Sequence, residues 1–176
     1  MEKAILAGGC FWCLDTVFRK LAGVESVVSG YTGGHVANPD YRSVCEGLTG
    51  HAEAVEITFD PQVIRYVDLL EVFFAIHDPT TLNRQGHDVG TQYRSAIFTT
   101  SEEQKTAAAV YRTQLDAKGI FSNPVVTEIV DAGPFYPAED DHQDYFEHHS
   151  SLPYCHIIIS PKLKKFREIF KDKLKS

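Results

Sequence analysis

The chain has 176 residues, of which 43% are hydrophobic and 23% charged, a balance typical of one soluble globular domain over residues 1–176. The net charge of −7 argues against nucleic acid or an anionic membrane as partner, and no apolar run approaches the roughly 20 residues that span a bilayer. Met1 leads directly into a strand, so we expect no signal peptide. Four cysteines in this length do not form a disulfide scaffold, which favours a reducing, cytoplasmic location.

Apolar residues recur at strand spacing in some runs and at helical spacing in others. In chain order, the predicted elements are a strand at 3–7, a helix at 12–22, strands at 24–30 and 53–59, a helix that opens at 60–61 and stops before 78, a strand at 93–99, a helix capped by Ser101 that runs to 117, a strand at 125–130, a helix at 139–148, a strand at 156–160 and a helix from Pro161. Without a regular βαβ repeat, this order predicts an α+β fold. Residues 78–92 lack periodicity and predict an ordered functional loop.

Cys10 follows two glycines at the predicted junction between the first strand and the first helix. A thiol at a helix start lies near unpaired N–H groups and the positive end of the helix dipole, which favours the thiolate. Phe11 and Trp12 beside it form a candidate apolar wall for a small substrate group. Cys13 lies one helical turn on and could close a disulfide with Cys10, although the CxxC spacing also suits zinc.

Glu53 opens a strand in which side chains alternate strictly between two faces. It shares its face with Val55, Ile57 and Phe59, so it points either into the core or into solvent at the strand end. Burial raises the pKa of a carboxyl group and makes it a general acid at neutral pH. The tight turn expected at Gly50 favours the core-facing, functional interpretation, because it brings this strand end to a surface depression.

Tyr31 and Tyr93 each follow a glycine-rich turn at a strand end, where a hydroxyl can meet a substrate oxygen. Asp88, in the long loop, is either a turn residue or an active-site carboxylate. His142, His148 and His149 share one acidic segment, for which a solvated helix face is favoured over metal binding. Cys45 and Cys155 stand alone, and core or strand packing is favoured over a redox role for both.

The run Gly8-Gly9-Cys10-Phe11-Trp12-Cys13 resembles the signature of the peptide methionine sulfoxide reductase A family. Other runs resemble that family in the same order, at 30–34, 41–45, 49–55, 59–61, 77–86, 88–95 and 135–139. Together they span residues 4–160, which makes a chance resemblance untenable. Asp141 departs from the pattern Ala-Glu-x-Tyr-His-Gln, which usually has tyrosine there, so any contact of that ring near the site is absent.

The resemblance implies a role for each matching residue. Cys10 attacks the sulfoxide sulfur of methionine sulfoxide, free or in oxidised proteins, and Glu53 protonates the oxygen. The remaining residues support these two: Tyr31 and Tyr93 hydrogen-bond the oxygen, Phe11 and Trp12 hold the terminal methyl group, Asp88 supports the site, and Cys13 resolves the Cys10 sulfenic acid as a disulfide.

The same resemblance implies a two-layer α/β sandwich with a ferredoxin-like mixed-sheet core and long coil segments. It also implies the S epimer of the sulfoxide as substrate, thioredoxin as external reductant, and no bound cofactor or metal. Two other interpretations stay open: a general thiol–disulfide oxidoreductase, which needs no Glu53, and a zinc-binding module built on Cys10 and Cys13. Cys155 is an alternative candidate for the resolving cysteine.

Overall fold

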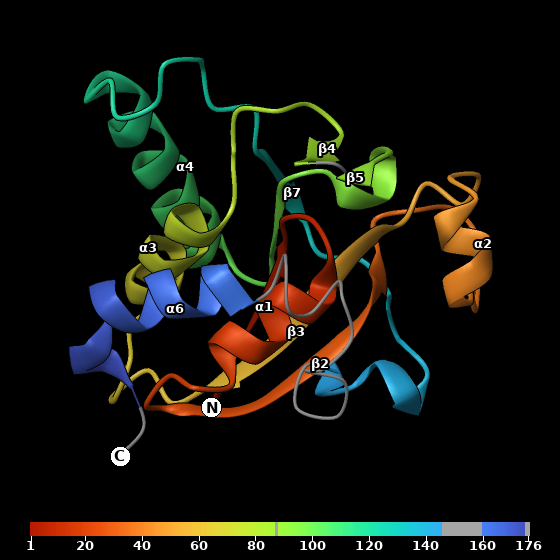
Figure 1. The fold of residues 1–176 in the computed structure, drawn as a ribbon, viewed down its shortest axis with the longest axis horizontal. Coiled ribbons are helices and arrows are strands. Elements are labelled where there is room, and N and C mark those ends of the chain that lie inside the picture. The colour runs from red at the N-terminus through yellow and green to blue at the C-terminus, as the bar shows by residue number, and fades with distance from the viewer. Residues whose placement is uncertain (87, 146–159, 175–176) are drawn as a thin grey trace.

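The computed structural model describes residues 1–86, 88–145 and 160–174 (Figure 1). Its strands are β1 (Glu2–Ala7), β2 (Val24–Thr32), β3 (Ala52–Phe59), β4 (Arg84–Gln85), β5 (Asp88–Val89), β6 (Ala96–Thr99), β7 (Glu128–Asp131) and β8 (Phe135–Pro137). Its helices are α1 (Phe11–Phe18), α2 (Tyr41–Cys45), α3 (Tyr66–Ile76), α4 (Glu102–Ala117) and α6 (Ser160–Ile169), with 3-10 turns η1 (Thr91–Tyr93), η2 (Asp140–His142) and η4 (Lys171–Lys173). The predicted α+β class is confirmed.

A six-stranded sheet in the order β7-β6-β1-β3-β2-β8 forms the framework. Its four inner strands are antiparallel to one another and are connected as β1-α1-β2-β3-α3-β6, which is the ferredoxin-like βαββαβ arrangement. Two short strands extend the edges: β7 pairs in parallel with β6, and β8 pairs antiparallel with β2 (Figure 1). The expected ferredoxin-like core is therefore confirmed.

The larger core lies between the helices and one face of this sheet. Helix α1 packs against β2 and β3, while α6 contacts α1 and α3. Val55, Ile57 and Phe59 of β3 are fully buried in this core, and Glu53, on the same face, is only 1% exposed. The alternation predicted for β3, and with it the inward orientation of Glu53, is confirmed.

Two predicted helices begin or end elsewhere in the structure. Helix α1 ends at Phe18 rather than near residue 22, because Leu21 leaves the helix to form an isolated bridge with Leu174. Helix α3 begins at Tyr66 rather than at Asp60 and Pro61, which lie in or next to a turn. The Asp68 side chain caps α3 by accepting the N–H of Arg65 at 3.0 Å.

The strand predicted at 93–99 is shorter, since residues 91–93 form η1 and β6 begins at Ala96. The strand predicted at 125–130 begins later, at Glu128. In place of the helix predicted from Glu139, η2 is followed by a turn in which Asp144 has a φ of +52°, a value that no α-helix accommodates. Residues 146–148 of that prediction lie outside the described residues, as do 156–159 of the strand predicted at 156–160, whose last residue, Ser160, begins α6 instead.

Two ends of predicted helices are confirmed. The Ser101 side chain caps α4 by accepting the N–H of Gln104 at 3.2 Å. The terminal helix α6 begins at Ser160, one residue before Pro161. Over the described ranges, none of the helices has both the length and the apolar character needed to cross a membrane.

Candidate active site

Cys10 lies between β1 and α1, as predicted. It is the N-cap residue of α1 with extended backbone angles, and its side chain is 6% exposed. Gly9 before it has a φ of +92°, and a Cβ there would lie 2.9 Å from the Gln85 side chain, so only glycine fits this turn. Cys13 is in the first turn of the same helix and is 4% exposed, and in the described part of the chain Cys10, Cys13 and Cys45 are not joined by a disulfide.

Glu53 faces Cys10 from the neighbouring strand β3. Its Oε1 atom accepts the backbone N–H of Phe11 at 3.2 Å, which ties the carboxyl group to the start of α1. Burial is the main effect that raises the pKa of Glu53 to about 8, and the negative charge of Asp88 raises it further. The hydrogen bonds with the Phe11 N–H and with Cys10 act in the opposite direction and lower the pKa. At neutral pH the carboxyl group is therefore mainly protonated and able to donate.

Aromatic rings surround Phe11 and Trp12. Phe11 lies 5.6 Å from the Tyr31 ring and 6.3 Å from the Tyr41 ring, between centroids. Tyr145 stacks on Trp12 at 3.9 Å with an interplanar angle of 8°. Phe11 and Trp12 therefore belong to one aromatic cluster, and their role as a wall for a substrate group stays a prediction.

Tyr31 is paired with Glu53 in the register of β2 and β3, so these two side chains share one face of the sheet, and Tyr93 belongs to η1, which contacts β3. Burial raises the pKa of Tyr93, and the charges of Glu53, Cys45, Asp88 and Cys10 raise it further. Burial also raises the pKa of Tyr31, followed by the effect of Glu139, to which the Tyr31 hydroxyl donates a hydrogen bond at 3.2 Å. Both hydroxyl groups are thus protonated donors, but the one of Tyr31 is already engaged.

Tyr41 is a site residue that the sequence analysis missed. Burial raises its pKa most, the charges of Glu53, Cys45 and Cys10 raise it further, and its hydroxyl forms a hydrogen bond with the Cys45 thiol. Its ring stacks with Trp12 at 6.1 Å. The resemblance of residues 41–45 to the reductase family could have pointed to Tyr41, but neither composition nor periodicity assigns this tyrosine a role.

Cys45, at the end of α2, is not in the core, so the packing role favoured for it is wrong. The residue is exposed, and its thiol interacts with the side chains of Tyr41 and Tyr93. Burial of the thiol group and the charge of Glu53 raise its pKa, against the lowering effect of the two tyrosines. The thiol therefore stays protonated and adjoins the site. Cys155 lies outside the described residues.

The solvated helix face favoured for His142 is also wrong. The ring is 7% exposed, and its Nδ1 atom accepts the indole N–H of Trp12 at 3.2 Å. His148 and His149 lie outside the described residues. Asp141, where the family pattern has tyrosine, is exposed, so its side chain does not contribute to the buried wall.

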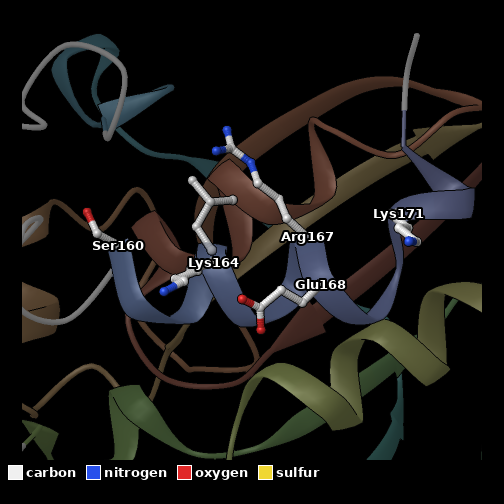
Figure 2. Close-up of a pocket in the computed structure, with 6 residues that line it drawn as sticks. Ser160, Lys164, Arg167, Glu168 and Lys171 are labelled. Atoms are coloured by element: carbon white, nitrogen blue, oxygen red, sulfur yellow. The ribbon is translucent and has the colours of Figure 1, made fainter.

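A cleft of about 970 Å³ opens beside Cys10 and gives it access to the surface. Asp88, Gln85 and Phe121 line it, so the long loop predicted at 78–92 forms one of its walls. A second hollow, of about 530 Å³, runs along α6 and is lined by Lys164, Arg167 and other residues of that helix (Figure 2). None of the predicted site residues lines it.

Within 1–86, 88–145 and 160–174, no group of three or more His, Cys, Asp or Glu side chains has the proximity needed to hold a metal ion. The zinc interpretation of Cys10 and Cys13 therefore gains no additional ligands from this part of the chain.

Comparison with known proteins agrees with this geometry. The family described as peptide methionine sulfoxide reductase matches residues 2–174. The chain belongs to this family. It is 58% identical over 176 residues to the peptide methionine sulfoxide reductase MsrA of Chromobacterium violaceum, with 100% of both chains covered.

Solved structures of the reductase family have the same fold. Mxr1 from Saccharomyces cerevisiae in reduced form matches with a TM-score of 0.82 and 34% identity, over 88% of each chain. Mxr1 in complex with Trx2 matches with a TM-score of 0.58 and 25% identity, over 82% of this chain and 84% of that chain. The reductase family resemblance read from the sequence is thus confirmed.

Proposed function

We propose that this protein is a peptide-methionine (S)-S-oxide reductase that acts on methionine sulfoxide in proteins and as the free amino acid. The observation that carries the proposal is the buried Glu53, which adjoins Cys10, accepts the N–H of Phe11 and has its pKa raised by burial to about 8. A general thiol–disulfide oxidoreductase has no use for a proton donor at this position. A sulfoxide needs one, because its oxygen is a poor leaving group until it is protonated.

The first half of the reaction needs a nucleophile, an acid and an apolar pocket. The Cys10 thiolate attacks the sulfoxide sulfur while Glu53 gives its proton to the oxygen. The oxygen is transferred to Cys10, which becomes a sulfenic acid, and methionine is released with its sulfur reduced by two electrons. Phe11 and Trp12 hold the terminal methyl group throughout.

Hydroxyl groups around the sulfoxide oxygen assist this step in our proposal. Tyr93 hydrogen-bonds the oxygen, and Tyr41, whose hydroxyl forms a hydrogen bond with the Cys45 thiol and feels the charges of Glu53 and Cys10, does the same. Tyr31 can donate to the oxygen only by leaving Glu139. Asp88 supports the site by raising the pKa of Glu53.

The second half restores the thiol. The Cys13 sulfur attacks the sulfenic sulfur of Cys10, the hydroxyl group leaves as water, and a Cys10–Cys13 disulfide forms. An external dithiol then reduces this disulfide by exchange. We propose thioredoxin for that role, supported by the similarity to Mxr1 in its complex with Trx2. No bound cofactor takes part, and the requirement for a supply of reduced dithiol suits a cytoplasmic location.

The test is reduction of each epimer of free methionine sulfoxide, with a dithiol as reductant and methionine as the measured product. We expect methionine from the S epimer alone with wild-type protein. Cys10→Ser is expected to form none, because a serine hydroxyl is not ionised at neutral pH. Methionine formation by Cys10→Ser would overturn the mechanism, and a wild-type protein that reduces only disulfides would favour the general oxidoreductase.

A further inference from the structure

Glu139 lies between β8 and η2 and connects three site residues. Its Oε1 atom accepts the hydroxyl proton of Tyr31 at 3.2 Å, and its Oε2 atom accepts the backbone N–H of Tyr41 at 3.4 Å. The Nε2 atom of His142 lies 3.7 Å from the same Oε2. The carboxylate side chain is 45% exposed, so one edge of it faces solvent while the other faces the site.

These contacts continue to the aromatic wall. Trp12 donates its indole N–H to Nδ1 of His142 at 3.2 Å, and an imidazole nitrogen can accept only when it carries no proton. In the neutral ring the proton is therefore on Nε2, the nitrogen that faces Glu139. A polar chain thus runs from Trp12 through His142 to Glu139 and on to Tyr31.

The rings attached to this chain are those that enclose Phe11. The His142 ring lies 4.3 Å from the Tyr41 ring and 5.7 Å from the Phe11 ring, between centroids. The Glu139 carboxylate accepts the backbone N–H of Tyr41 and lies next to the Nε2 atom of His142. One carboxylate therefore contacts two members of the aromatic cluster around Phe11 and Trp12.

We propose that Glu139 is a positioning residue of the sulfoxide site, which pre-orders Tyr31, Tyr41 and His142 before substrate binds. This inference rests on the proposed function. Glu139 takes no part in bond making, so its loss weakens substrate binding and leaves the attack by Cys10 largely intact. Pre-ordering of a pocket increases affinity because fewer side chains have to be immobilised when the ligand binds.

The test compares Glu139→Ala, Glu139→Gln and a matched control, Asp140→Asn, which changes the neighbouring, exposed carboxylate. Single-turnover reduction of free methionine sulfoxide is measured against its concentration. We expect Glu139→Ala to raise the half-saturating concentration about tenfold, with the saturated rate within about threefold of wild type. A glutamine has one acceptor oxygen and can replace only one of the two bonds, so Glu139→Gln is expected to fall in between. Asp140→Asn should match wild type.

Trp12 gives a second readout, because it is the only tryptophan of the chain. Release of His142 changes the surroundings of the indole ring, so Glu139→Ala is expected to shift the tryptophan emission of the folded protein, and Asp140→Asn is not. In a double-mutant cycle, Tyr31→Phe and Glu139→Ala together should cost less than the sum of the two single changes.

The inference is overturned if Glu139→Ala binds the sulfoxide as well as wild type does, or more tightly, since the bond to Tyr31 would then only compete with the substrate. Full additivity with Tyr31→Phe contradicts it as well. If Glu139→Ala does not fold, the half-saturating sulfoxide concentrations of Glu139→Gln and wild type are compared in its place, and equal values overturn the inference. Wild-type protein that reduces no sulfoxide would instead contradict the proposed function, which keeps the two failures apart.

Discussion

At the scale of single residues, the site depends on placing one proton and one negative charge correctly. A neutral Glu53 leaves no fixed anion next to Cys10, so the thiol can ionise beside a group that is ready to donate. Both requirements come from the same burial, which raises the pKa of the carboxyl group to about 8. Asp88 contributes from the loop side with its charge.

Glu53→Gln keeps the shape and a hydrogen-bond donor but cannot transfer a proton. We expect its single-turnover rate of methionine formation to fall by about 10²–10⁴-fold, the usual contribution of general acid catalysis. The wild-type rate should fall as the pH rises through about 8, because Glu53 loses its proton there, and Glu53→Gln should lack this decline. A variant rate within a few-fold of wild type would assign the proton to Tyr41 or Tyr93 instead.

Cys13→Ser should separate the chemical step from recycling. One methionine per protein molecule should still form, since Cys10 is intact, whereas steady-state turnover with thioredoxin should collapse and the sulfenic acid of Cys10 should become trappable. The measurement is methionine yield with and without reductant, together with mass mapping of the disulfide after one turnover. Unchanged steady-state turnover would exclude Cys13 as the resolving residue and leave Cys155 as the next candidate.

At the scale of elements, the buried carboxylate of Asp15 links α1 to its neighbours by hydrogen bonds and an ion pair. Asp15 is fully buried, ion-paired with Arg19, and accepts the Ser29 hydroxyl at 3.2 Å and the N–H of Asp144 at 2.8 Å. It therefore connects the helix that starts at Cys10 with β2 and with the turn after η2. Burial raises the pKa of Asp15, although the charge of Arg19 opposes this.

Asp15→Asn breaks the charge pair and leaves Arg19 without its main partner. We expect the free energy of unfolding to fall by about 3 kcal/mol, the scale found when one member of a buried ion pair is removed. Ser29→Ala, which removes only one hydrogen bond, should cost about 1 kcal/mol. Urea denaturation of both variants measures the difference, and equal losses would show that the charge of Asp15 is not what matters.

How far the sequence predicts these elements depends on what decides each one. The alternation in β3 placed Glu53 correctly, because side-chain period alone determines which face a strand residue occupies. The ends of α1 and α3 were missed, since a long-range bridge from Leu21 to Leu174 and the cap at Arg65 decide them. The burial of His142 and the exposure of Cys45 depend on tertiary contacts that no local pattern encodes.

At the scale of the whole molecule, the two ends of the described chain pack together. Besides the bridge at Leu174, the N–H of Ala22 donates to the carbonyl of Lys173 at 2.8 Å, and α6 contacts α1. The C-terminal helix thus covers the same core that the first strand and helix begin. From this packing between 160–174 and the first helix we propose that the chain forms one cooperative unit, as the sequence predicts.

A single unit should unfold in one transition. We expect the emission of Trp12, which reports the site, and far-UV circular dichroism, which reports all helices and strands, to give the same midpoint and slope in urea. Two separate transitions, or emission that changes well before the circular dichroism does, would contradict a single domain.

The order of the strands predicts which part of the site opens first when the protein is warmed. Cys10 and Glu53 are attached to β1 and β3, the two central strands, whereas Glu139 and His142 follow β8, a three-residue strand at the sheet edge. Edge strands open locally far more often than central ones. We therefore expect warming to loosen the segment with Glu139 and His142 before it moves Cys10 and Glu53. A molecule that has opened locally in this way should keep Cys10 and Glu53 in place but should select less strictly between substrates.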